Sequence, residues 1–116
     1  MQMKISASAR DYFVGHYAGP YNTSPFETVR FDSVAQAMLY VKSKMDYFQT
    51  RCYGFVVYTD RKVKEGRHYI HEVLLRWHND GTDCGGELVN PAVGWRICID
   101  ADNHITEEHF TPKEET

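Results

Sequence analysis

The side chains best suited to bind a transition metal gather in one segment of the chain. His68, His71 and His78 lie close together in the sequence, and Glu72 follows the second of them. In a helix these three imidazoles would share one face, and zinc could bind there. In a strand His71 would point away from the other two, because successive side chains alternate between faces. The H-E-x-x-H motif is absent, and we predict neither a metal site nor a cofactor.

Cys84 is the residue with the clearest potential for covalent chemistry. It stands in the run Asp83-Cys84-Gly85-Gly86, where the glycines would let a substrate approach the backbone. A reactive thiolate needs a neighbouring base, and the sequence pairs no particular histidine with this cysteine. The nucleophile-elbow, P-loop and dinucleotide-binding patterns are absent. We therefore expect no catalytic residue, although an enzyme that uses Cys84 or a histidine stays among the hypotheses.

Basic residues cluster where the chain is expected to turn between two strands, at 60–66. Guanidinium and ammonium groups bind phosphates and carboxylates, and a neighbouring tyrosine can stack on a base. The alternative is an ordinary solvated turn, and the net charge of −3 argues against general nucleic-acid binding. The candidate binding residues of this cluster are Tyr58, Arg61, Lys62, Lys64, Arg67 and Tyr69.

Four further side chains could contribute to binding. Tyr40 and Tyr47 lie on a second stripe of the expected helix, either beside the core with their hydroxyl groups in water or on a partner surface. Arg76 and Arg96 could hold the phosphates of a nucleotide, as could Arg67. Such a ligand would lie between chains of an oligomer.

Charge is distributed unevenly along the chain. Residues 1–78 carry eleven Lys and Arg against seven Asp and Glu, and residues 79–116 carry two against nine. This polarity could orient the protein on a partner or favour head-to-tail self-association. At the acidic end Glu107 and Glu108 are candidate contacts for a basic partner, or they are simply solvated.

Composition is typical of a soluble globular protein, with 42% hydrophobic and 25% charged residues. No apolar run is long enough to span a membrane, and we see no signal peptide, so we predict a cytoplasmic protein without membrane contact. The three cysteines lack a C-x-x-C pair and are expected to be free thiols. The aromatic content of 14% favours β structure and leaves rings available for interfaces.

The stretch 31–48 is the one convincing helix of the sequence. No Pro or Gly interrupts it, and Ser33 followed by Gln36 could form a capping box at its start. Apolar residues recur at alternating steps of four and three, which places them on one face. That stripe is Val34, Met38, Val41, Met45 and Phe48.

Alternating and β-branched residues predict the strands. Residues 52–59 should form a central strand because both of its faces are apolar. For 67–78 both periods fit, and the aromatic and β-branched content favours a strand, with one face formed by Tyr69, His71, Val73, Leu75 and Trp77. Other strands are expected at 1–8, 94–100 and 104–110. Residues 12–17 are strand-like, and 28–31 could form a short strand that enters the helix, while loops are expected at 18–25, 60–66 and 79–86.

This order of elements predicts an α+β fold. One long helix should pack on a curved antiparallel sheet of about four to six strands, as a single pair of layers. The whole chain, 1–116, is expected to be one domain with a polar tail at 111–116. The two apolar faces of 52–59 further predict a homo-oligomer.

Three functions remain open from the sequence. The leading hypothesis is a small non-enzymatic binding protein that docks an aromatic, charge-polarised surface on a macromolecular partner, with a protein as the expected partner. A phage or mobile-element inhibitor of host machinery would be one such protein. The alternatives are a binding protein for a nucleotide or another small anion, and a small enzyme.

Overall fold

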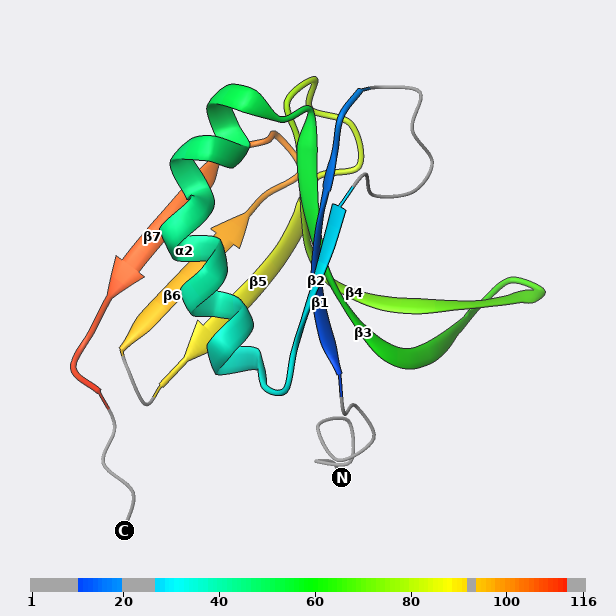
Figure 1. The fold of residues 1–116 in the computed structure, drawn as a ribbon, viewed down its shortest axis with the longest axis horizontal. Helices are drawn as coiled ribbons and strands as arrows, with labels where there is room; N and C mark the ends of the chain where they lie inside the picture. The colour runs from blue at the N-terminus through cyan, green and yellow to red at the C-terminus, as the bar shows by residue number, and fades with distance from the viewer. Residues whose placement is uncertain (1–10, 20–26, 92–93, 113–116) are drawn as a thin grey trace, which may run out of the picture.

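The computed structural model describes residues 11–19, 27–91 and 94–112. In this part of the chain seven strands form one curved antiparallel sheet in the order β2-β1-β3-β4-β5-β6-β7, and the helix α2 (Val34–Arg51) packs in its hollow (Figure 1). The strands are β1 (Tyr12–Tyr17), β2 (Glu27–Phe31), β3 (Gly54–Glu65), β4 (His68–His78), β5 (Gly85–Asn90), β6 (Trp95–Ile99) and β7 (Ile105–His109).

The start of α2 confirms the predicted cap. Ser33 has an extended backbone, and its Oγ accepts a hydrogen bond from the backbone N–H of Gln36 at 3.2 Å. The side-chain Oε1 of Gln36 in turn accepts from the backbone N–H of Asp32 at 3.1 Å. This is a capping box in which the return bond reaches one residue further back than in the usual form.

One face of α2 forms the core together with the sheet, as the apolar stripe predicts. Met38, Val41 and Phe48 are buried, while Val34 and Met45 are half-buried at the margin. The ring of Phe48 stacks on Phe55 of β3 with centroids 4.7 Å apart. Large rings at this contact contribute more buried apolar area than any aliphatic pair would.

The sheet consists of two halves joined by a short seam. Strands β4 and β5 pair only at Leu75 with Gly86 and at Arg76 with Gly85. Each of the other neighbouring pairs extends over five or more residue positions. Helix α2 contacts β1, β2 and β3 on one side of the seam and β5 on the other.

The predicted strand count of four to six is wrong, since the described residues contain seven. The additional strand is β5, which begins inside the segment predicted as a loop at 79–86. Gly85 and Gly86 are poor strand formers by propensity. They form a strand here because β4 and β5 approach each other closely. A Cβ added at Gly86 would collide with the backbone of β4, so only glycine fits at this position.

The predicted turn at 60–66 is also wrong. Strand β3 continues through the charged residues to Glu65, and the turn is confined to Gly66 and Arg67. The adjoining segment is a strand, β4, as favoured over the helix. Strands expected at 12–17, 28–31, 94–100 and 104–110 are confirmed as β1, β2, β6 and β7 within one or two residues.

A β-bulge changes the predicted faces of β4. Val57 lies opposite Leu75, but the next residue, Tyr58, lies opposite Val73, so one residue of β4 is extra. Leu75 and Trp77 therefore face the helix, whereas Val73 and His71 face away from it. The strict alternation expected along 67–78 placed these four residues and Tyr69 on one face, and it is wrong there, because Tyr69 also faces away from the helix.

Several predictions fall on residues that the structure does not describe. The strand expected at 1–8 lies outside the described residues, as does most of the loop at 18–25. The tail predicted at 111–116 is described only at 111–112, which are exposed. The helix found among the described residues is too polar to cross a bilayer.

Candidate binding surface

The hairpin formed by β3 and β4 extends well past the rest of the sheet (Figure 1). β1 pairs with β3 only as far as Thr59, and β5 pairs with β4 only at Leu75 and Arg76. Residues 60–72, which we call the arm, therefore have no other neighbouring strand among the described residues. At about 3.3 Å per residue the six steps from Asp60 to Gly66 reach roughly 20 Å from the sheet.

A two-stranded ribbon of this length is only marginally stable by itself, and polar contacts hold its root. Thr59 is almost completely buried, and its hydroxyl accepts from the backbone N–H of Arg61 at 3.1 Å and donates to Glu72 at 3.3 Å. The guanidinium of Arg61 donates to the other carboxylate oxygen of Glu72 at 2.9 Å. His71 Nδ1 lies 3.0 Å from the Thr59 carbonyl oxygen, which can only accept, so this nitrogen carries the proton.

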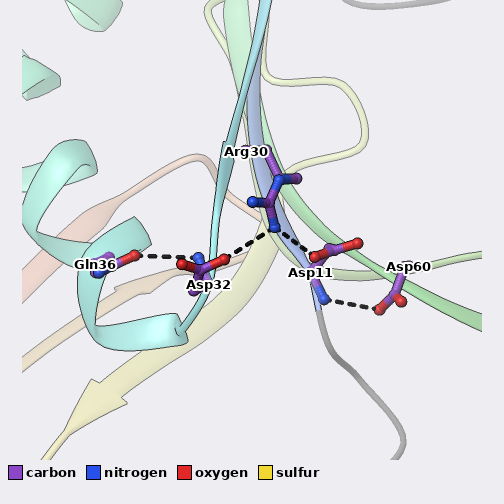
Figure 2. Close-up of polar contacts among 5 residues, drawn as sticks. All are labelled: Asp11, Arg30, Asp32, Gln36 and Asp60. Carbon is purple, nitrogen blue, oxygen red and sulfur yellow. Dashed lines mark hydrogen bonds and ion pairs between the residues drawn. The ribbon is translucent and has the colours of Figure 1, made fainter.

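A second set of contacts fastens the root to β1 and to the start of the helix (Figure 2). Asp60 and Asp11 exchange two hydrogen bonds, from the backbone N–H of Asp60 to the Asp11 carbonyl and from the backbone N–H of Asp11 to Asp60 Oδ1. Arg30 of β2 bridges Asp11 and Asp32, at 2.6 and 3.0 Å. Gln36 extends the chain of contacts into α2. The arm thus starts from a fixed base.

The arm presents two different faces. Lys62 lies opposite His71, and Lys64 lies opposite Tyr69, so these four side chains share one face. The other face carries Val63 opposite Ile70, together with the paired Arg61 and Glu72. The His71 ring lies 5.4 Å from the Tyr58 ring, which shows that the first face continues the outer face of the sheet, the one turned away from α2.

The outer face of the arm is cationic and aromatic. Tyr69 is 65% exposed, an unusually high value for a large ring. Lys62 and Lys64 are exposed, as is Arg67 in the turn, and no described group makes a hydrogen bond or ion pair with any of the three. Their charges are therefore available to a partner.

Aromatic rings continue this surface into the sheet. Phe13 of β1 stacks on Tyr58 with centroids 5.0 Å apart and an interplanar angle of 19°. Val73, opposite Tyr58, is partly exposed beside them. The structure thus brings together the predicted site residues Tyr58, Lys62, Lys64, Arg67 and Tyr69, while Arg61 is committed to the root of the arm.

Arg76 lies on the same outer face, between Val56 of β3 and Gly85 of β5. Val56 is only 2% exposed in the single chain. The apolar outer face of β3, which suggested a homo-oligomer, is therefore covered without a second chain, and the oligomer stays a prediction that rests on charge alone.

The helix tyrosines lie away from the arm. Tyr40 is half-buried against Phe31 and Phe48, with centroids 5.1 and 6.4 Å away, and burial raises its pKa. Tyr47 is more exposed, and the Cys52 thiol beside it is the main cause of its raised pKa. Both rings pack against Phe48, so they flank the core.

The remaining candidates form internal contacts at the other end of the sheet. Arg96 of β6 bridges Glu87 of β5 and Glu108 of β7, the latter at 3.1 Å. Arg96 and Glu108 border a shallow depression of about 180 Å³ with Cys98 and Thr106. Glu107 accepts from the indole N–H of Trp95 at 3.1 Å. Arg76 pairs with Gly85 of β5, and Arg96 pairs with Val89 of the same strand. These two positions lie four residues apart, roughly 13 Å, so the two arginines do not form one site.

Cys84 and His78, which were considered for covalent chemistry and metal binding, make other contacts. Among the described residues no group of His, Cys, Asp and Glu side chains has the geometry to hold a metal ion. The Cys84 thiol is half-buried and donates to Asn103 Oδ1 at 3.0 Å. His78 Nδ1 donates to the Thr82 carbonyl at 2.7 Å and so orders the loop before β5. Because this nitrogen already carries a proton, it cannot act as a base toward the Cys84 thiol.

Two features of this surface, the length of the arm and the β-bulge, were not predicted from the sequence. The arm was predicted as a short turn, although the alternation of Val63 with Lys62 and Lys64 is a strand signal. The bulge that places Tyr69 and His71 on the outer face has no signal in the sequence, because it arises from pairing between strands. No protein-family model, curated protein or solved structure matches this chain.

Proposed function

We propose that the protein is a non-enzymatic binding protein that docks the outer face of its arm on the acidic surface of a protein partner. The observation that carries this proposal is a solvent-exposed tyrosine, Tyr69, placed between cationic side chains on a hairpin with a fixed root. Tyrosine and arginine are enriched among residues that dominate binding energy. Unpaired lysines steer association with a partner of opposite charge.

The arm is suited to this task because its root is ordered while its tip is accessible. Thr59, Arg61 and Glu72 hold the base of the hairpin in one geometry. A pre-organised element loses less conformational entropy on binding than a mobile loop does. The aliphatic pair on the opposite face, the half-buried Val63 and the exposed Ile70, would let a partner close around the arm.

A protein partner is favoured over nucleic acid by the charge of the arm. Between Asp60 and Glu72 the chain carries Arg61, Lys62, Lys64 and Arg67 against Asp60, Glu65 and Glu72, and Arg61 is neutralised by Glu72. Three available cations make few phosphate contacts by comparison with proteins that bind nucleic acid. They suit a short acidic patch.

The test uses a photocrosslinking amino acid placed at position 69 of the full chain, expressed in its native host. A matched probe at Leu39, which is 56% exposed on α2, serves as the control. We expect one protein to crosslink through position 69 and not through position 39. Its capture should fall at least about tenfold, or about 1.4 kcal/mol, when Lys62→Glu and Lys64→Glu are combined.

The matched charge control is Lys42→Glu with Lys44→Glu, two exposed lysines of α2. This variant should retain the crosslinked partner. A crosslink that nuclease removes would assign the arm to nucleic acid and overturn the protein-partner proposal. Equal capture through positions 69 and 39 would remove the arm from the function altogether.

A further inference from the structure

We propose that Arg76 is the anion-binding residue of a second site, which takes the phosphate group of a small ligand on the outer face of the sheet. This site is separate from the arm and goes beyond the docking function. Arg76 lies at the seam between the two half-sheets, with Val56 on one side and Gly85 on the other.

The first observation is an unsatisfied donor. Nε of Arg76 is buried and has no hydrogen-bond partner among the described residues. A buried polar group without a partner is costly in a folded protein and calls for an explanation. An oxyanion that accepts from Nε and from a terminal nitrogen would satisfy it, in the bidentate geometry that arginine offers to phosphate.

The second observation is that the charge of Arg76 is incompletely neutralised. Its nearest carboxylate is Asp83, with Nη1 and Oδ2 3.7 Å apart, beyond hydrogen-bond distance, and the Asp83 side chain is 76% exposed. The Arg76 side chain is itself 29% exposed. Arg96 differs, because two glutamates engage its guanidinium directly.

The third observation is the position of Arg76 among its neighbours in the sheet. Gly15, Val56, Arg76 and Gly85 lie side by side across β1, β3, β4 and β5. Gly15 and Val56 are buried, whereas Arg76 and Gly85 are partly exposed, so the accessible end of this row lies at the seam.

Aromatic rings border the row on both sides. Phe13 and Tyr58 stack along one side, and Tyr17 meets His78 edge to face at 5.2 Å along the other. A guanidinium with aromatic rings on both sides suits a phosphate attached to a planar group, such as a nucleoside monophosphate.

The test follows the Nε–Hε signal of Arg76 by NMR in the ¹⁵N-labelled full chain, titrated with inorganic phosphate, with adenosine monophosphate and with adenosine. Sodium chloride at matched ionic strength is the control. We expect both phosphates to shift this signal saturably in the millimolar range or below. Adenosine alone should leave it unchanged, and tighter binding of the nucleotide than of phosphate would show that the rings take part.

Three variants define the site. Arg76→Lys keeps the charge but loses Nε, and should weaken phosphate binding about tenfold. Arg96→Lys should bind as the parent does, and Asp83→Asn should bind more tightly because a competing carboxylate is gone. Amide spectra establish that each variant is folded.

The proposal is overturned if phosphate leaves the Arg76 signal unmoved, or if Arg76→Lys binds phosphate as well as the parent. A shift caused by adenosine alone would equally exclude an anion site. The variant that combines Lys62→Glu with Lys64→Glu should bind phosphate normally, so failure of the arm proposal and failure of this one are distinguishable.

Discussion

Replacing Gly86 with alanine should destabilise the protein strongly, because this residue lies in the seam where β4 approaches β5. Its φ is +117°, a conformation that L-residues rarely adopt. An added Cβ would lie 2.6 Å from the Cα of Leu75 and would also overlap the carbonyl of Leu74. These are backbone atoms, which cannot rotate away as a flexible side chain would.

The size of the effect follows from two contributions. The unfavourable backbone conformation costs about 1–3 kcal/mol. Relieving the overlap requires β4 and β5 to separate by about 1 Å, and overpacking of this kind costs about 1–3 kcal/mol. We therefore expect Gly86→Ala to lower the free energy of unfolding by about 4 kcal/mol, which for a domain of this size lowers Tm by roughly 15 °C.

Urea denaturation followed by the fluorescence of Trp77 and Trp95 measures this change. The matched control is Gly66→Ala at the tip of the arm, where φ is +61° and nothing lies within 4 Å of the added Cβ. That variant carries the conformational cost alone, about 1–2 kcal/mol. If Gly86→Ala loses no more stability than Gly66→Ala, the close approach of β4 and β5 is wrong.

Three further predictions concern the core, acid stability and thiol reactivity. Phe48→Ala should lower the free energy of unfolding by about 3–5 kcal/mol, because Phe48 is 1% exposed and stacks on Phe55. Hydrogen bonds from Tyr53 and Thr82 hold the pKa of Asp80 at about 2, below its ordinary 3.8, so the stability that this carboxylate provides is present above pH 3.8 and lost as pH falls through about 2. Cys52 should react with a disulfide reagent more slowly than Cys98, because Cys52 is buried and burial raises its pKa.

Each of these has a control within the chain. Tyr47→Ala, at the exposed neighbour of Phe48, should cost less than about 2 kcal/mol, and an equal loss in the two variants would contradict the packing of α2. Asp80→Asn should flatten the acid limb of the stability profile, measured by urea denaturation between pH 5 and pH 2. An unchanged profile would argue against the Tyr53 contact. Faster labelling of Cys52 in the folded protein would contradict its burial.

The sequence predicted the helix and its packing face well because both depend on local signals. Ser33 and Gln36 cap α2, and the spacing of Met38, Val41 and Phe48 sets the face that it buries. Such features require no knowledge of distant residues. For the same reason the short strands with clear alternation, such as β6, were predicted near their observed bounds.

Features that depend on pairing between strands were predicted poorly. The low strand propensity of Gly85 and Gly86 predicts a loop. Only their contact with β4 explains why they begin a strand. The charged run after Thr59 resembled a turn, and it is extended because β4 pairs with it far beyond the sheet. The candidate surface was therefore predicted as a set of residues, whereas its shape and its orientation were not.

The position of α2 across the seam has a consequence for cooperativity. Strand pairing joins the two half-sheets at only two residue pairs between β4 and β5. Helix α2 contacts strands on both sides of this seam. If α2 detached as one half-sheet unfolded, the apolar residues that it covers on the other half would be exposed to water. The chain should consequently behave as a single cooperative unit, in which β1 to β4 and β5 to β7 melt together and neither persists as an independent foldon.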